Sequence, residues 1–184
     1  MKTQYNVISK DVMPELIPVL TENEIDQNVQ VLAKRISEDY RNKDLVMIGV
    51  LKGSFVFLSD LMRRLTIPVE IEFIRLSSYG KSDMSSGTID IQNDISMDLK
   101  GKDVLVVEDI VDTGLTLATL VDHLKSFKPK SVKICALIDK LERREIDCKV
   151  DYACHTVEGG FLVGYGLDYA EKYRNLPAIY HLKL

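Results

Sequence analysis

The stretch VLVVEDIVDTGLT, residues 104–116, decides the fold class that this sequence predicts. It opens with four aliphatic residues in a row, which is typical of a strand buried on both faces. The acidic pair Glu108 and Asp109 follows, then an Asp-Thr-Gly turn at 112–114, and then apolar residues at helical spacing from Leu117 to Leu124. A buried strand that leads directly into an amphipathic helix is the repeating unit of a parallel sheet.

The same alternation of helices and strands recurs along the chain. Thr21 and Glu24 form a capping box before a helix that we expect to reach about Tyr40, and a second helix should begin at Phe55 and stop before Pro68. Further strands are predicted at 45–51, 69–76, 132–138, 152–155 and 161–164, with a short returning strand at 89–91. The sequence therefore predicts an α/β fold, with a mainly parallel central sheet flanked by helices, in a single domain over residues 1–184.

The composition and charge exclude several classes of protein. Hydrophobic residues make up 46% of the 184 residues, enough to bury a core, so a fully disordered chain is excluded. With 24 Lys and Arg against 28 Asp and Glu, the net charge is −4, which argues against nucleic acid as a partner. No run approaches the roughly 18 uncharged apolar residues of a membrane helix, and charges within residues 1–20 argue against a signal peptide.

The three cysteines, Cys135, Cys148 and Cys154, indicate a reducing compartment. Their odd number and unpaired spacing do not suit a disulfide framework, so we expect a cytoplasmic protein. Cys154 is followed by His155, but no second Cys/His cluster completes the four ligands of a zinc site.

The turn after the acidic pair is a candidate phosphate site. Asp112, Thr113, Gly114 and Thr116 offer backbone N–H groups and hydroxyls at the start of a helix, where the helix dipole favours anions. The pattern is not a Walker loop. Taken alone, Asp-Thr-Gly is more simply interpreted as a capped turn between a strand and a helix.

The acidic pair before the turn favours a binding site over a merely structural turn. Glu108 and Asp109 repel each other and lose solvation at the end of a buried strand, and both costs must be offset. A cis-diol, a metal-bound polyphosphate or a developing cation would offset them.

The stretch 104–116 resembles the phosphoribosyl-pyrophosphate motif of the type I phosphoribosyltransferases, since hydrophobic run, acidic pair, Asp-Thr-Gly and hydroxyl residue occur in order. Further stretches resemble the hypoxanthine(-guanine) phosphoribosyltransferases within that family. These are Leu51-Lys52-Gly53, Ser78-Tyr79, Lys140, the run Phe161 to Tyr165, Leu167-Asp168-Tyr169 and Arg174. The resemblance spans residues 40–180 and implies the family's fold, with a small base-binding hood formed by the N-terminal and C-terminal segments.

The resemblance also implies a reaction and a part for each residue in it. A 6-oxopurine would be joined to the anomeric carbon of phosphoribosyl pyrophosphate through an oxocarbenium-like transition state. The 5′-phosphate would lie at Asp112, Thr113, Gly114, Leu115 and Thr116, the ribose at Glu108 and Asp109, and the pyrophosphate at Lys52, Gly53 and Arg174. The purine would contact Lys140, Phe161, Leu162 and Asp168, while Ser78 and Tyr79 would open a flexible lid over about 77–88. Mg²⁺ is the expected cofactor, at Glu108, Asp109 and Asp168, and a homodimer or homotetramer is the expected assembly.

Four of these assignments have plainer alternatives. Asp112 matches the family's proposed general base at the purine N7, but it could instead cap the following helix. Lys140 could read the 6-oxo group, or be an ordinary solvated lysine at a strand end. Phe161 could stack on the purine, or belong to the core. The polar segment 77–88 could be an ordinary loop rather than a lid.

Two positions depart from the family's pattern, and one implied feature cannot be derived from the residues. Leu115 stands where some relatives carry lysine, which puts phosphate affinity in doubt, and Ser54 stands where some carry glycine. The family holds the peptide bond before Lys52 in the cis form.

The alternative function is a regulatory protein of this fold that binds phosphoribosyl pyrophosphate without catalysis. Known regulators of the fold add a DNA-binding domain, for which neither the length nor the charge gives support.

Overall fold

The computed structural model describes residues 14–78, 89–91 and 95–183, which form a six-stranded sheet, a three-stranded sheet and three helices. The large sheet has the strand order β4-β3-β2-β5-β6-β7. Its five parallel strands are β2 (Leu45–Leu51), β3 (Glu70–Ser78), β5 (Asp103–Val111), β6 (Ser131–Lys140) and β7 (Tyr152–Val157). The short β4 (Ile89–Ile91) returns antiparallel to β3.

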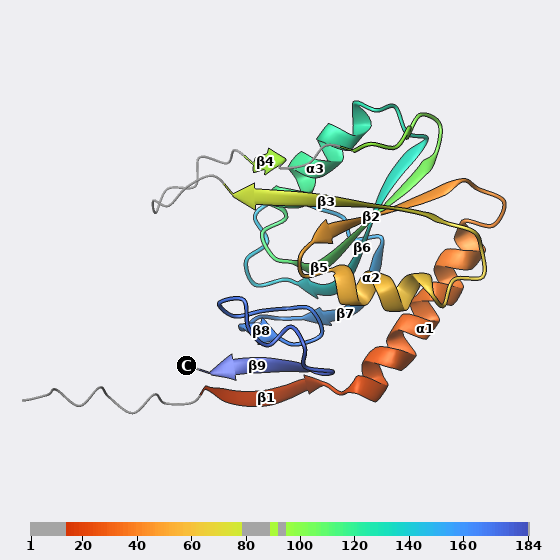
Figure 1. Ribbon diagram of the computed structural model, residues 1–184. Coiled ribbons are helices and arrows are strands. Elements are labelled where there is room, and N and C mark those ends of the chain that lie inside the picture. Colours follow the sequence, from red (N-terminus) through yellow and green to blue (C-terminus); the bar gives the residue numbers. More distant parts are fainter. Residues whose placement is uncertain (1–13, 79–88, 92–94, 184) are drawn as a thin grey trace, which may run out of the picture.

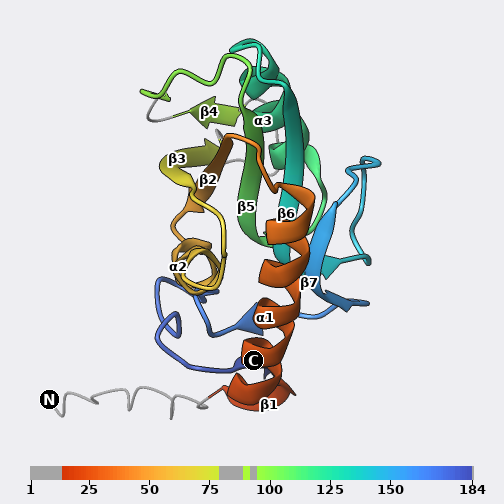
Figure 2. The same ribbon diagram turned by 90° about the vertical axis from the view of Figure 1, so that its right-hand side faces the viewer.

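Helices cover both faces of this sheet, as Figures 1 and 2 show. Helices α1 (Glu22–Asp39) and α2 (Phe55–Met62) lie on one face, and α3 (Leu115–Lys125) lies on the other. A hydrophobic core lies on each face of the sheet, because successive side chains of β5 point to opposite faces. Leu105 and Val107 pack with α1 and α2, whereas Val104 and Val106 pack with α3. The predicted α/β fold with a mainly parallel sheet between helices is confirmed.

The first helix begins as its sequence predicts. Thr21 is the N-cap of α1, its hydroxyl accepts from the Glu24 amide at 3.3 Å, and the Glu24 carboxylate accepts from the Thr21 amide at 2.8 Å. Residues Ile25, Val29 and Ile36 are buried along one side, as their spacing requires. None of the three helices in the described ranges combines the length and apolarity needed to cross a membrane.

The small sheet joins segments from the two ends of the chain. Its order is β1-β9-β8, all antiparallel, with β1 at Glu15–Leu20, β8 at Leu162–Val163 and β9 at Ile179–Lys183 (Figure 1). Neither β1 nor β9 was predicted from the sequence. Pro18 obscures β1, because proline is compatible only with an edge strand, and β1 is one, with a register shift between Pro18 and Leu20.

Several element ends differ from prediction. The largest difference is in β5, which runs on through Val111, so the acidic pair lies inside the strand and not after it. Pairing with β6 continues to Val111 and Asp139, and this ladder outweighs the weak strand propensity of the acids. Helix α2 ends at Met62, a few residues before the predicted stop.

Candidate functional site

Two cavities of about 230 Å³ each open at the carboxyl ends of the parallel strands. Ligands of open α/β sheets bind at this edge. One cavity, here called the phosphate cavity, is lined by Val50, Leu76 and residues from Glu108 to Leu117. The other, here called the base cavity, is lined by residues from four separate segments: Asp109, Ile110 and Asp112; Lys140 and Arg143; Gly160, Phe161 and Leu162; Leu167 and Asp168. Asp112 and Ile110 line both and form the wall between them.

The turn at 112–116 places the start of α3 against the phosphate cavity. Gly114 is the N-cap of α3 and has φ 85°, a left-handed conformation that favours glycine. A β-carbon there would also lie 2.9 Å from Cβ of Cys148. The hydroxyl of Thr113 accepts from the Leu115 amide at 3.3 Å, and Thr116 reaches the cavity from the first turn of α3. Four of the five predicted phosphate residues, Asp112, Thr113, Gly114 and Thr116, thus line one concave surface, whereas Leu115 does not line it.

Arg144, which was not among the predicted site residues, holds this turn through hydrogen bonds to its backbone. Its guanidinium donates to the carbonyl oxygens of Asp112 at 3.1 Å, Val111 at 3.3 Å and Lys140 at 3.2 Å. It also donates to the Cys148 carbonyl at 2.8 Å and forms an ion pair with Asp139. One side chain therefore fixes the end of β5 to the end of β6. No local pattern marks this arginine, because its partners come from three parts of the chain.

Glu108 and Asp109 face opposite sides of the sheet. Glu108 continues the side of Val106 and lines the phosphate cavity, whereas Asp109 continues the side of Val107 and lines the base cavity. Burial raises the pKa of the Glu108 carboxyl well above its ordinary value, and the neighbouring Asp109 adds to this. Of the two acidic side chains, Glu108 is thus the one whose ionised form is disfavoured by burial.

The predicted pyrophosphate loop approaches Asp109 closely. The peptide bond between Leu51 and Lys52 is cis, as the resemblance implied. A β-carbon on Gly53 would lie 1.5 Å from Oδ2 of Asp109, so only glycine fits beneath that carboxylate. Ser54 is fully buried, and its hydroxyl donates to the Val50 carbonyl at 2.7 Å. Serine is therefore accommodated at that position.

Asp112 and Lys140 meet at the wall between the cavities. Nζ of Lys140 lies 3.6 Å from Oδ1 of Asp112 and 3.8 Å from Oε2 of Glu142. Nη1 of Arg143 lies 3.6 Å from Oδ2 of Asp112. Oδ1 of Asp112 is buried and has no hydrogen-bond partner among the described residues. Such an oxygen is available to a ligand proton.

This geometry excludes two of the plainer alternatives, those for Asp112 and for Lys140. The N-cap of α3 is Gly114, so Asp112 does not cap that helix. Lys140 is only 7% exposed, so it is not a solvated lysine at a strand end. Burial of a lysine is costly, and the carboxylates of Asp112 and Glu142 offset that cost.

The base cavity carries an exposed aromatic pair. Phe161 is 52% exposed, so it does not belong to the core, and its ring packs edge-to-face on Tyr169 with centroids 5.5 Å apart. Leu162 is buried in the short strand β8 beneath it. An exposed ring beside a cavity offers a stacking surface for a planar ligand.

The cations of the predicted pyrophosphate site are held by acidic residues of the C-terminal segment. Lys52 donates to Oε2 of Glu171 at 2.8 Å. Arg174 pairs with Oδ1 of Asp168 at 2.7 Å and donates to the Gly166 carbonyl at 2.8 Å. Glu171 was not among the predicted site residues. Its position beside Lys52 depends on how the segment folds back over the loop.

One of the predicted site residues, Tyr79, cannot be placed. Tyr79 and residues 79–88 of the predicted lid lie outside the described residues. Ser78 ends β3, where its backbone pairs with Ile89.

The three predicted metal ligands do not form one cluster. Among the described residues, no group of three or more His, Cys, Asp and Glu side chains is arranged to hold a metal ion. Glu108 faces the phosphate cavity, whereas Asp109 and Asp168 line the base cavity. Mg²⁺ is commonly bound by one or two carboxylates together with substrate phosphates, and this arrangement suits that mode rather than an all-protein cage.

The comparisons with known proteins agree with this geometry. The model of the phosphoribosyl transferase domain family matches residues 19–170. The chain therefore has the fold of a phosphoribosyltransferase and belongs to that domain family.

Its relatives narrow the class. The hypoxanthine-guanine phosphoribosyltransferase of Aquifex aeolicus is 48% identical over 163 residues, which is 88% of this chain and 92% of that one. The enzyme of the same name from Streptococcus pneumoniae is 43% identical over 165 residues, 90% of this chain and 92% of that one. A crystal structure of a hypoxanthine phosphoribosyltransferase from Staphylococcus aureus has a TM-score of 0.87 at 42% identity and covers 90% of each chain. The chain therefore belongs to the hypoxanthine-guanine phosphoribosyltransferase family.

Proposed function

We propose that this chain transfers the phosphoribosyl group of phosphoribosyl pyrophosphate to hypoxanthine, and also to guanine, giving IMP or GMP and pyrophosphate for purine salvage. The observation that carries the proposal is the pairing of Lys140 with Asp112 at the wall between a phosphate cavity and a base cavity. The relatives are named as transferases, which does not favour the alternative of a regulatory protein without catalysis.

Lys140 and Asp112 suit one edge of a 6-oxopurine. The O6 and N7 atoms of such a base lie side by side on that edge. The Lys140 ammonium would donate to O6, while the buried Oδ1 of Asp112, 3.6 Å away, would accept the proton from N7. Adenine presents an amino donor in place of O6, so it would leave the lysine unpaired and be rejected.

The sugar phosphate would span the wall between the two cavities. The start of α3 and the hydroxyls of Thr113 and Thr116 would bind the 5′-phosphate, with backbone donors at 112–116. The carboxylate of Asp109 would accept from the ribose hydroxyls and favour positive charge on the anomeric carbon as pyrophosphate departs. Glu108, whose pKa is raised in the ligand-free chain, would act with it once a bound cation favours its ionised form. Phe161 would stack on the purine, and Leu162 and Asp168 would complete its pocket.

Mg²⁺, bound with phosphoribosyl pyrophosphate, would neutralise the charge of the departing pyrophosphate. Asp109, which lines the base cavity, and Glu108, which lines the phosphate cavity, would hold this ion, and Asp168 would bind a second Mg²⁺ through water. Lys52, Gly53 and Arg174 would face the pyrophosphate itself. We further propose that Ser78 and Tyr79 belong to a lid over the site and that residues 1–184 form one domain.

We also propose a cytoplasmic location and self-association as a homodimer or homotetramer. The free thiols of Cys135, Cys148 and Cys154 support the first. Phe55 and Met62 are exposed two turns apart on α2, on one face of that helix, which supports the second. Sedimentation of the full chain would measure its oligomeric state, and a monomer at micromolar concentration would contradict the proposal.

The decisive experiment offers the chain phosphoribosyl pyrophosphate, Mg²⁺ and equal concentrations of hypoxanthine, guanine, xanthine, adenine, uracil and orotate. We expect IMP and GMP as the main nucleotide products, and loss of product when excess EDTA removes the divalent metal. Binding of phosphoribosyl pyrophosphate without any nucleotide product would favour the regulatory alternative. AMP or a pyrimidine nucleotide as the main product would contradict the assignment of Lys140.

A further inference from the structure

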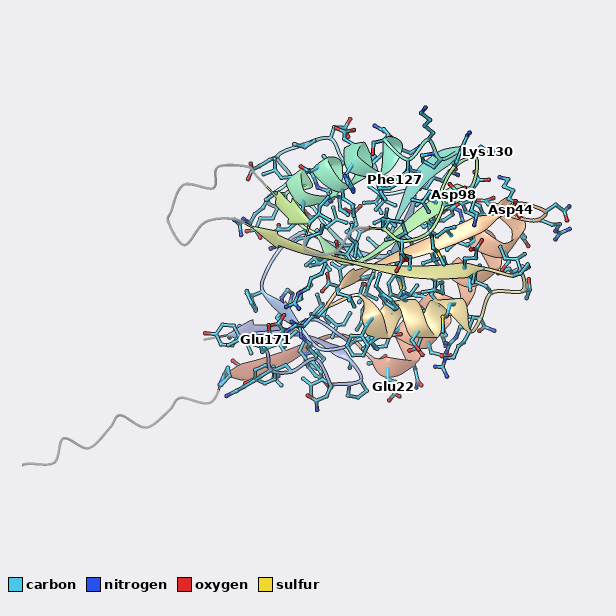
Figure 3. All side chains as sticks on the ribbon, turned by 45° about the horizontal axis from the view of Figure 1, so that its top comes forward. Glu22, Asp44, Asp98, Phe127, Lys130 and Glu171 are labelled. Atoms are coloured by element: carbon cyan, nitrogen blue, oxygen red, sulfur yellow. The ribbon has the colours of Figure 1, made fainter. Side chains whose placement is uncertain are left out.

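One carboxylate oxygen sits between the two cations that we assign to pyrophosphate. Oε2 of Glu171 lies 2.8 Å from Nζ of Lys52 and 3.4 Å from Nη2 of Arg174. Figure 3 places Glu171 at the end of the molecule opposite to Asp44 and Lys130, which precede the strands β2 and β6. Glu171 is therefore at the carboxyl edge of the sheet, where the cavities open.

The segment that carries Glu171 is built against the pyrophosphate loop. A β-carbon on Gly166 would lie 2.1 Å from the carbonyl oxygen of Gly53, so the two backbones are in close contact. Oδ2 of Asp168 accepts from the Glu171 amide at 2.9 Å and fixes the turn. Ala170, Glu171 and Tyr173 have φ between 50° and 74°, a left-handed conformation that is unfavourable for residues with a side chain. The turn therefore presents Glu171 to Lys52 at a cost in backbone energy.

We propose that Glu171 is an internal competitor of pyrophosphate, whose carboxylate occupies Lys52 and Arg174 in the ligand-free chain and is displaced when a pyrophosphoryl group binds. The proposal rests on the proposed function, because it takes Lys52 and Arg174 as pyrophosphate ligands. An oxygen shared by both cations is where a pyrophosphate oxygen would lie. The two anions cannot occupy that position together, since like charges at contact distance repel.

The contact is suited to exchange rather than to permanent structure. The side chains of Lys52 and Glu171 are 47% and 65% exposed, so water can replace each partner. The hydrogen bond from Lys52 lowers the pKa of Glu171, so the group is a carboxylate at neutral pH. Competition by Glu171 would weaken the binding of both phosphoribosyl pyrophosphate and product pyrophosphate, and it would speed release of the product.

The test compares the full chain with Glu171→Gln and Glu171→Asp. Calorimetric titration with pyrophosphate and Mg²⁺ measures the Kd, and initial rates give the KM values of phosphoribosyl pyrophosphate and hypoxanthine. Gln removes the charge, whereas Asp keeps it but withdraws the carboxylate by one methylene from both cations. We expect both variants to bind pyrophosphate about two- to five-fold more tightly, as expected for an exposed ion pair. The KM of hypoxanthine should stay within about two-fold.

A matched control is Glu38→Gln, which removes an exposed glutamate on α1, distant from the site, and should leave the Kd unchanged. Unchanged or weaker pyrophosphate binding in Glu171→Gln would overturn the competitor role while leaving the proposed function intact, because it would mean that Glu171 has no role or that it orients Lys52. Tighter binding in Gln but not in Asp would also overturn it, since the effect would then come from net charge rather than contact. Failure of the unaltered chain to bind pyrophosphate at all would overturn this inference, and the absence of nucleotide product in the nucleobase experiment would separately show that the proposed function is wrong.

Discussion

The phosphate cavity and the base cavity have the same volume, about 230 Å³, but the chain builds them in different ways. Eight of the ten residues that line the phosphate cavity come from the single stretch Glu108 to Leu117. The base cavity draws on four segments that lie up to 59 residues apart, from Asp109 to Asp168. A site built from one strand, turn and helix start is specified locally, whereas a site built from four segments exists only after the large sheet has formed and the C-terminal segments have packed against it.

The two cavities also differ in how they bind. The phosphate cavity offers backbone donors at a helix start that is fixed by Gly114 and by the hydrogen bonds of Arg144. The base cavity offers side chains: a buried lysine, a carboxylate oxygen that makes no hydrogen bond to the described residues, and an exposed ring. Substitution of a side chain in the base cavity should therefore affect use of the purine alone. Substitution of Asp112, which lines both cavities, should affect the reaction as a whole.

The largest effect is expected at the wall that the cavities share. Asp112→Asn keeps the shape of the side chain but removes its capacity to take a proton, so kcat should fall by about 10²- to 10⁴-fold. The KM of phosphoribosyl pyrophosphate should change little, since the backbone donors of the turn remain. Steady-state rates with each substrate varied would measure this, with Asp122→Asn on α3 as the control. A rise in KM with unchanged kcat would make Asp112 a binding residue instead of the general base.

The next effect is expected where the pyrophosphate loop meets the base cavity. In Gly53→Ala the new methyl group would lie 1.5 Å from Oδ2 of Asp109, so the loop or the carboxylate must move. A displacement of this size at a reacting group costs about 100-fold in kcat/KM. Gly101→Ala is the control for backbone strain away from the site, since a β-carbon there meets nothing within 4 Å although its φ of 74° is left-handed. Equal activity of the two variants would show that the close contact has no catalytic importance.

A smaller and more selective effect is expected within the base cavity. Lys140→Ala removes the donor to O6, and loss of a charged hydrogen bond should raise the KM of hypoxanthine roughly 10- to 100-fold. Binding of phosphoribosyl pyrophosphate should be nearly unchanged, because Lys140 does not line the phosphate cavity. Lys125→Ala on α3 serves as the control. Equal losses for both substrates would contradict two separately built cavities.

The smallest effect concerns stability in the phosphate cavity. The pKa of Glu108 is raised in the folded chain, so above pH 4.5, the ordinary value, the folded chain keeps a proton that the unfolded chain has lost. The free energy of unfolding should then fall as pH rises, by at most about 1.4 kcal/mol per pH unit for one proton. Glu108→Gln should abolish this slope, and denaturant unfolding between pH 5 and 8 would measure it. If the unaltered chain and Glu108→Gln showed the same slope, Glu108 would be ionised in the folded chain.

Residues that act locally were predictable from the sequence. The capping box at Thr21 and Glu24, the buried strand β2 and the turn around Gly114 follow from spacing and backbone preference, and the structure has them where expected. The predicted end of β5 was wrong, because pairing with β6 continues the strand past the acidic pair to Val111. Local propensity cannot anticipate a ladder whose partner is more than twenty residues away.

Residues of the base cavity were predicted only through resemblance to a family. Nothing near Lys140 in the chain indicates that its ammonium is buried between Asp112 and Glu142. Arg144 and Glu171 were missed for the same reason, since their partners are brought to them by the folding of other segments. The strands β1 and β9 were missed because each pairs with the far end of the chain.

The sequence by itself determined the alternation of buried strands and amphipathic helices, and with it the parallel sheet and the phosphate turn at the end of β5. These depend on interactions between residues close together in the chain, whose geometry is set by side-chain periodicity and by glycine at a left-handed position. Only the tertiary structure decided that Asp112 faces Lys140, that Glu108 and Asp109 serve different cavities, and that Glu171 reaches Lys52. Those contacts depend on strand order, on the pleat of β5 and on the return of the C-terminal segment, which bring distant residues together only when the whole core has packed.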